Sequence, residues 1–201
     1  MRVICLFSLT ILLGGLGCSK SVEEYVEQLR KGDGEERMDA AVVLGERQAS
    51  AAVAVLEERL AKDDWHLVRA TCARALTRIG APKSAEAFVR ALEDKSPTVR
   101  WESVLGLGRL GARTEASTIA ALLKEDTDPR VRRECAKVLG LFESARHIPD
   151  LIGALEDRDA TVRLHAELAL RRVTLRDLGP YADDWRAWYE DFLVRMERDS
   201  G

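Results

Sequence analysis

The chain has 201 residues, of which 31 are Lys or Arg and 34 are Asp or Glu, so its formal net charge at pH 7 is −3. This balance lacks the strongly basic character of a nucleic-acid-binding domain, and we expect no nucleic-acid partner. The length is sufficient for one sizeable hydrophobic core.

The N-terminus carries a short apolar segment. Residues 3–13 (VICLFSLTILL) follow Arg2 and precede the small residues Gly14, Gly15 and Gly17. A transmembrane helix needs about 20 apolar residues, so this segment is too short to span a bilayer. Its length suits the hydrophobic part of a secretory signal peptide.

Cys18 directly follows this segment, and the arrangement resembles a bacterial lipoprotein signal. The resemblance implies that residues 1–17 are removed, that Cys18 is lipidated and that residues 18–21 form a short membrane tether. Ser19 is similar to the residue found in lipoproteins sorted to the outer membrane, which implies a cell-envelope protein that faces the periplasm. Gly15 stands where such signals usually have Leu, so an ordinary signal peptide and an uncleaved anchor are the alternatives.

Arginine recurs along the chain at steps of 31 or 32 residues, and we call the five residues the arginine ladder: Arg37, Arg69, Arg100, Arg132 and Arg163. A period in the thirties with a helical pattern predicts a stacked solenoid, whose units bury their apolar faces only against their neighbours. Val usually precedes the arginine, although Glu36 replaces it in the first unit. A small residue follows the arginine after three positions and Leu after seven, and these positions share one stripe of a helix.

Capping residues mark where the second helix of a unit begins. Ser96-Pro97 and Asp128-Pro129 each combine a side chain that can accept a backbone N–H with proline at the first helical position. Asp159 holds the same place in the last unit. Shorter first helices are predicted at residues 52–60, 84–92, 116–123 and 149–155.

Two cysteines lie inside the array, each three residues after a ladder arginine. Cys72 and Cys135 occupy the small-residue position of their units, which lie two repeats apart. At about 10 Å per helix layer this separation is ~20 Å, whereas a disulfide needs Cα atoms within about 7 Å. We expect two buried free thiols that form neither a bridge nor a metal site.

The clearest copy of the repeated pattern is residues 126–132 (DTDPRVR), followed by Leu139-Gly140. The pattern resembles the short bacterial HEAT-like repeats of the phycobilin-lyase type. The resemblance implies an all-α fold, a right-handed superhelix of about five helical pairs over residues 22–174. It indicates function poorly: some relatives attach bilins, whereas most known members are scaffolds or partner-binding modules.

Four ladder residues, Arg69, Arg100, Arg132 and Arg163, are predicted to have a structural role. A planar guanidinium suits a two-pronged bond to a carboxylate. The expected acceptors are either the turn of the neighbouring repeat or an Asp six or four residues before the arginine: Asp63, Asp94, Asp126 and Asp157. The alternative is a row of anion-binding sites.

The C-terminal segment, residues 175–201, departs from the repeat. After Leu178-Gly179-Pro180 a new helix is predicted, with aromatic residues at helical spacing: Trp185, Trp188, Tyr189 and Phe192. Such a tail resembles those that close many bacterial HEAT arrays, so we expect a cap on the last repeat. The alternative is an aromatic ligand box.

The resemblance implies that the second helices line the concave face of the array. Positions two, five and nine after each ladder arginine are expected to point outward, among them the acidic Glu102 and Glu134. The predicted partner-binding residues are Arg74, Arg78, Trp101, Leu105, Arg109, Arg133, Lys137, His165 and Arg172.

Two tryptophans have open interpretations. Trp101 lies beside Arg100, where the other repeats have no aromatic residue, and is a candidate partner anchor. Its alternative is packing against the next repeat. Trp65 lies in a loop and either covers a turn between helices or contacts a partner.

The three histidines, His66, His147 and His165, lack metal-ligand spacing, and no nucleophile elbow or phosphate-binding loop is present in the sequence. We therefore expect no catalytic residues and no cofactor. The leading hypothesis is a membrane-anchored, non-enzymatic scaffold that binds a protein partner through the concave face. The alternatives are a bilin-lyase-like cofactor-attachment enzyme and a purely structural envelope spacer.

Overall fold

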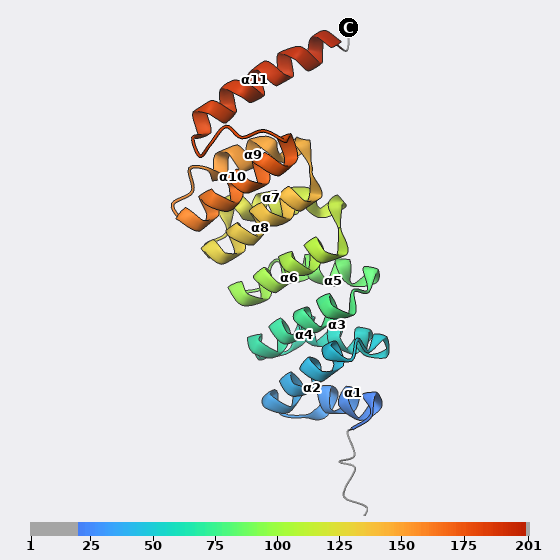
Figure 1. Cartoon of the computed structure of the whole chain (residues 1–201). Helices are drawn as coiled ribbons and strands as arrows, with labels where there is room; N and C mark the ends of the chain where they lie inside the picture. Colours follow the sequence, from blue (N-terminus) through green and yellow to red (C-terminus); the bar gives the residue numbers. More distant parts are fainter. Residues whose placement is uncertain (1–19, 200–201) are drawn as a thin grey trace, which may run out of the picture.

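The computed structural model describes residues 20–199, and within that range its helices follow one another in pairs, with no strand (Figure 1). The first helices of the pairs are α1 (Val22–Lys31), α3 (Val53–Lys62), α5 (Ala85–Ala91), α7 (Ala116–Glu125) and α9 (Ile148–Ala154). The second helices are α2 (Gly34–Glu46), α4 (His66–Ile79), α6 (Pro97–Leu110), α8 (Pro129–Phe142) and α10 (Ala160–Thr174). A final helix, α11 (Ala182–Asp199), follows them. The predicted all-α solenoid of five helical pairs is confirmed.

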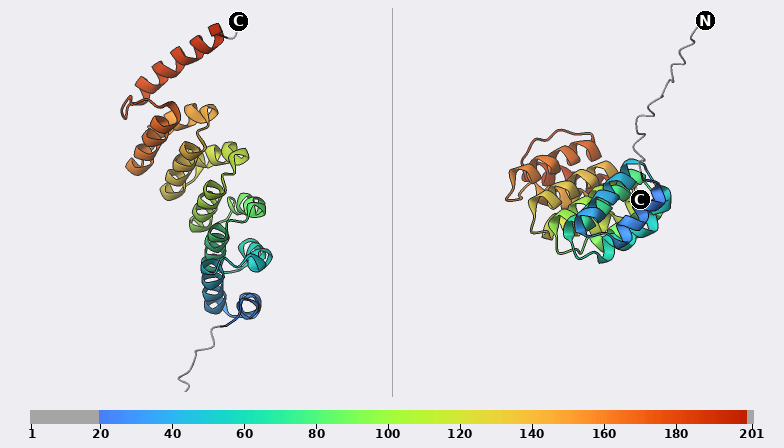
Figure 2. Two further views of the ribbon diagram at one scale, coloured as in Figure 1. Left: turned by 45° about the vertical axis from the view of Figure 1, so that its right-hand side comes forward. Right: turned by 90° about the horizontal axis from the view of Figure 1, so that it is seen from below.

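The pairs stack into two layers of helices. Each second helix packs on the first helix of its own pair and on the second helices of the neighbouring pairs. The column bends toward the second helices, as Figure 2 (left) shows. We call their exposed side the inner face of the array.

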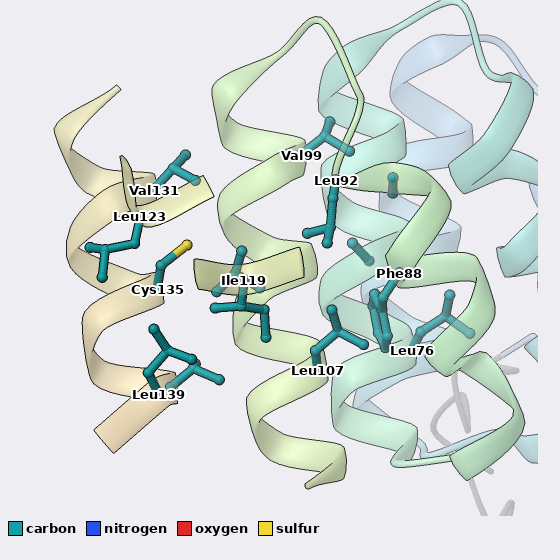
Figure 3. Close-up of a cluster of buried hydrophobic side chains, with 14 of the residues drawn as sticks. Leu76, Phe88, Leu92, Val99, Leu107, Ile119, Leu123, Val131, Cys135 and Leu139 are labelled. Carbon is teal, nitrogen blue, oxygen red and sulfur yellow. The ribbon is translucent and has the colours of Figure 1, made fainter. Parts of the chain in front are cut away.

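The core follows the stripe predicted from the repeat. Its members are all fully buried: Val68, Val99, Val131 and Val162 before the arginines, and Leu44, Leu76, Leu107, Leu139 and Leu170 seven residues after them. Phe88 and Ile119 from the first helices fill the space between successive second helices (Figure 3). Burying each such side chain stabilises the fold by about 1.5–3 kcal/mol, and much of this burial requires the neighbouring repeats.

The small-residue positions three residues after the ladder arginines are equally buried. Cys72 and Cys135 are inaccessible to solvent and are free thiols. Burial raises the pKa of both thiols. Ser103 occupies the same position in α6 and satisfies its hydroxyl by donating to the Val99 carbonyl at 2.8 Å.

Most of the predicted helix starts agree with the structure. Asp128 accepts the N–H of Arg130 at 2.8 Å, and Asp159 accepts that of Thr161 at 2.8 Å. Ser96 precedes α6 but makes no capping bond with its side chain, so that part of the prediction is wrong. A turn of 3-10 helix that the pattern did not reveal leads into each later first helix, at Ser50–Ala52, Pro82–Ser84, Arg113–Glu115 and Ala145–His147.

The first half of α11 lies against the end of the first-helix layer. Trp185 is fully buried, and its Nε1 donates to the Gly179 carbonyl at 2.8 Å. Trp188 packs partly against the core and stacks on Phe192, with ring centres 5.5 Å apart. The helix packs on α9. Because the rings contact one another and the core, these contacts favour the cap interpretation over the ligand box.

A glycine tests how closely α8 and α10 approach. A Cβ built on Gly140 would lie 2.8 Å from the Cβ of Ala169. Gly140→Ala is therefore expected to lower the free energy of unfolding by about 1–3 kcal/mol. Gly153→Ala on α9 is the matched control, because its Cβ would meet nothing within 4 Å; it should be neutral or stabilise by about 0.5–1 kcal/mol. Denaturant unfolding measures both variants, and equal effects would contradict the close approach.

Candidate functional site

Each of the first four ladder arginines connects two consecutive repeats. Arg100 donates from Nε and Nη2 to the two carboxylate oxygens of Asp126 in the next repeat, at 2.7 and 2.8 Å. Its Nη1 donates to the backbone carbonyl of Asp94 in its own repeat at 2.8 Å. The same arrangement links Arg37 to Asp63, Arg69 to Asp94 and Arg132 to Asp157.

Each of these aspartates also organises the turn in which it lies. The carboxylate of Asp94 accepts the backbone N–H of Ser96 at 2.8 Å, in addition to the Arg69 guanidinium. Burial opposes ionisation of Asp94, but the bonds from Arg69 and Ser96 outweigh it and hold its pKa below the ordinary value. The pKa of Asp157 is lowered in the same way by Arg132 and the N–H of Asp159, against the opposing effect of burial.

These contacts correct the expected partner of the ladder. For Arg69, Arg100 and Arg132 the aspartate six residues earlier offers its backbone carbonyl, whereas the carboxylate comes from the next repeat, 25 or 26 residues later. The alternative that named the neighbouring repeat's turn agrees with the structure. In the four linked arginines the side chains are only 4–16% exposed and both prongs are occupied, which leaves no row of open anion sites.

Arg163 differs from the other members of the ladder. It is exposed, and its Nη1 donates to the carbonyls of Asp157 and Arg158 at 2.8 and 3.2 Å. Among residues 20–199 no carboxylate pairs with it, because α10 is the last second helix of the described array.

The middle of the inner face carries paired charges. Glu102 and Glu134, which were expected to point outward, are 1% and 3% exposed, so that expectation is wrong. Arg74 donates from Nε to Glu102 across the repeat boundary at 2.7 Å. Lys137 donates to both oxygens of Glu134 at 2.9 Å. Burial raises the pKa of Glu102, although Arg74 opposes this shift.

Trp101 is held by the next repeat. The ring is partly buried against the core, and its Nε1 donates to Glu134 at 3.3 Å. This geometry is that of the packing alternative and not of a free anchor. Leu105 and Arg133 are half-buried, while Arg109 is exposed near the end of α6. Trp65 lies over the first residue of α2, since a Cβ on Gly34 would be 2.4 Å from its ring.

The last two second helices enclose a groove that the sequence did not reveal as a unit. It has a volume of about 240 Å³ and is lined by Lys137, Gly140, Leu141, His165, Leu168, Ala169 and Arg172. We call it the α8/α10 groove. Three of the predicted partner-binding residues, Lys137, His165 and Arg172, therefore lie together. Arg74 and Arg78 line a smaller hollow of about 60 Å³ between α2 and α4.

The α8/α10 groove has an apolar lining and a cationic rim. Leu141 and Leu168 are 45% and 48% exposed, and Gly140 adds no side chain to the floor. Arg172 approaches Glu143 at 3.6 Å, and both side chains are more than half exposed. His165 makes a 2.7 Å hydrogen bond from Nδ1 to the Thr161 carbonyl, which directs Nε2 away from the helix backbone.

No helix within residues 20–199 combines the length and the apolar character needed to cross a membrane. The predicted leader and the predicted lipidation site at Cys18 lie outside the described residues.

Comparison with known proteins agrees with the repeat architecture. The family model described as HEAT repeats matches residues 8–77, 66–126 and 116–181. A HEAT repeat-containing taxis protein of Halobacterium salinarum is 32% identical over 72% of this chain and 40% of its own length. Deoxyhypusine hydroxylase of Mus musculus is 31% identical over 61% of this chain and 39% of its own length. The chain spans about two fifths of the length of these relatives.

Solved structures show the same fold. The complex of CpcE and CpcF of phycocyanin lyase from Nostoc sp. PCC7120 gives a TM-score of 0.70 at 23% identity, over 84% of this chain and 71% of that one. A designed armadillo repeat protein in complex with the peptide (KR)4 gives 0.58 at 18% identity, over 76% and 82%. At these identities the similarity concerns the fold alone.

The ladder is expected to carry much of the coupling between repeats. Arg100→Gln should lower the free energy of unfolding by about 2–4 kcal/mol, because it leaves the buried Asp126 carboxylate without its cation. Arg109→Gln on the same helix is the control and should change it by less than about 0.5 kcal/mol. Urea unfolding followed by circular dichroism measures both variants. Similar values for the two would refute a structural role of the ladder.

Acidification is expected to destabilise the array. The folded-state pKa values of Asp94 and Asp157 are lowered, so their ionised bonds contribute fully above the ordinary pKa of about 4. That contribution is lost as pH falls through the lower folded-state values. Asp157→Asn should therefore lose less stability than wild type between about pH 5 and pH 2. The exposed control Asp183→Asn should follow wild type, and an Asp157→Asn curve parallel to wild type would contradict this assignment.

Proposed function

Because this chain belongs to the HEAT-repeat family, we propose that it is a non-enzymatic scaffold that binds a protein partner through its inner face. The α8/α10 groove is the observation that carries the proposal. Two half-exposed leucines, Leu141 and Leu168, line a concavity of about 240 Å³. Apolar hollows of this kind, surrounded by polar groups, are typical centres of protein interfaces.

The rim of the groove indicates the charge of the partner. Lys137, His165 and Arg172 surround the leucines. The pair of Arg172 with Glu143 is exposed and 3.6 Å long, and such surface pairs contribute little, so Arg172 can exchange Glu143 for a partner's carboxylate at low cost. The matching partner segment presents an apolar side chain next to one or more acidic residues.

A structural relative supports this mode of binding. The designed armadillo repeat protein holds a peptide of alternating Lys and Arg, (KR)4. The inner face of our chain differs from a surface for basic peptides, because the carboxylates of Glu102 and Glu134 are buried beneath Arg74, Trp101 and Lys137. Lys137 and Arg172 line the groove, whereas their carboxylate partners lie beneath it at Glu134 or beside it at Glu143, which favours an acidic segment in place of a basic one.

Anchoring to a membrane is part of the proposal and rests on the sequence. The segment before Cys18 resembles a lipoprotein signal, and Ser19 follows it. A lipid on Cys18 would hold the protein at the outer membrane with the array in the periplasm. The helix α1 begins at Val22, with Ser21 as its N-cap in a capping box with Glu24. The tether would then be so short that the array lies close to the bilayer surface.

Crosslinking in intact cells of the source organism tests the proposal. Wild type and Leu193→Asp, a control at an exposed leucine of α11 away from the groove, should yield one discrete protein adduct. Leu168→Asp should lose that adduct, because a carboxylate in the groove repels an acidic partner. The N-terminal peptide of the same samples should carry a lipid on Cys18.

Four results would count against parts of the proposal. An adduct that survives Leu168→Asp would exclude the groove as the binding site. The absence of a discrete adduct would favour a structural spacer. If the purified chain attached a pigment to another protein, this would favour the cofactor-attachment alternative. That alternative is considered because the phycocyanin lyase complex has a similar fold. An unlipidated Cys18 would refute the anchor.

A further inference from the structure

The C-terminal end of the second-helix layer presents an incomplete copy of the inter-repeat contact. Each earlier ladder arginine has its Nε and Nη2 bonded to an aspartate of the next repeat, as in Arg132 with Asp157 at 2.7 and 2.8 Å. Arg163 makes only the carbonyl bonds within its own turn. Its Nε and Nη2 are expected to point toward the end of the array, as those of Arg132 point toward Asp157. Among the described residues no carboxylate accepts a hydrogen bond from them.

The residue that follows each ladder arginine in the sequence also loses its contact with a following repeat at this end. At this position Met38, Ala70, Trp101 and Arg133 are buried or half-buried in the four earlier repeats. Trp101 shows what covers the position, because its Nε1 bonds Glu134 of the following second helix. Leu164 is the last member of the series and is 51% exposed. An apolar side chain therefore lies uncovered beside the open guanidinium.

The helix α11 covers the other layer at this end. It packs on α9, and Arg186 pairs with Glu156 at the end of that first helix. It thus takes the place that a sixth first helix would have, and no further second helix lies on α10 within residues 20–199. The uncovered surface, which we call the end face, consists of Arg163 and Leu164 on α10.

We infer that the end face binds another helical protein, through an acidic turn followed by a helix, in the way that each repeat receives the next. The carboxylate of that turn would accept the two free prongs of Arg163, and the helix after it would cover Leu164. The four contacts between consecutive repeats of this chain show the chemistry that the partner needs. In each of them the aspartate of the turn also accepts the backbone N–H two residues later.

A second copy of this chain does not meet that requirement. In the turn between α1 and α2 the position six residues before Arg37 is Lys31, where the later repeats have the aspartate. The carbonyl that bonds Arg37 in this turn belongs to Gly32, at 2.8 Å. Stacking two copies end to end would therefore bring Lys31 and Gly32, and not the required aspartate, to Arg163. The partner is therefore a different protein, and the inference stands independently of the α8/α10 groove.

A photoreactive amino acid at position 164 tests the inference in cells of the source organism. The adduct is expected to map, by mass spectrometry of the crosslinked peptide, to a turn with Asp or Glu at the start of a helix in another protein. Arg163→Gln should reduce its yield about tenfold or more, since a charge-assisted two-pronged bond is lost. Arg163→Lys keeps the charge but not the two-pronged geometry and should also reduce it.

The control Arg195→Gln, at an exposed arginine of α11 that lies in neither proposed surface, should keep the adduct. Circular dichroism should show that Arg163→Gln remains folded, because Arg163 makes no link between repeats. The inference would be overturned by an adduct with a second copy or with a segment that has no acidic turn. It would also be overturned if Arg163→Gln left the yield unchanged, or if no adduct formed. Leu168→Asp separates the two proposals, because it should remove binding in the groove and preserve the adduct at position 164.

Discussion

A two-pronged hydrogen bond from an arginine of one repeat to an aspartate of the next connects the whole array. The aspartate fixes its own turn through the N–H two residues later, and the arginine fixes the preceding turn through a backbone carbonyl. A repeat has too little apolar surface to fold alone, so its stability depends on the face that it shares with its neighbours. Dispersion and burial supply most of the energy, whereas the directional bond sets the register in which the faces meet.

This register determines what the inner face presents. The fifth residue after the arginine meets the second residue after the next arginine, which brings Arg74 onto Glu102. In the last repeat the corresponding residue is His165, and Lys137 instead bonds Glu134 of its own helix. The α8/α10 groove lies at this break in the pairing. The same periodicity that buries the acidic residues in the middle of the face therefore leaves an open cationic hollow at one end.

The sequence predicted the helical pairs and the buried stripe, because a residue's position within a repeat decides its burial. It could not decide which copy of a repeated residue is the partner. An aspartate six residues before Arg100 and one 26 residues after it satisfy the same pattern, and only the stacked structure distinguishes them. The burial of Glu102 and Glu134 has the same origin, since the residues that cover them come partly from the adjacent repeat. The lipid anchor lies outside the described residues and stays a prediction.

The link between repeats is the central claim, and a double-mutant cycle tests it most directly. Arg100→Gln and Asp126→Asn, singly and together, should show a coupling of about 1.5–3 kcal/mol in denaturant unfolding. The parallel cycle of Arg100→Gln with Asp94→Asn should show a clearly smaller coupling, because Arg100 bonds the carbonyl of Asp94 and acts on its carboxylate only through its charge. Coupling to Asp94 in place of Asp126, or additivity in both cycles, would contradict the account.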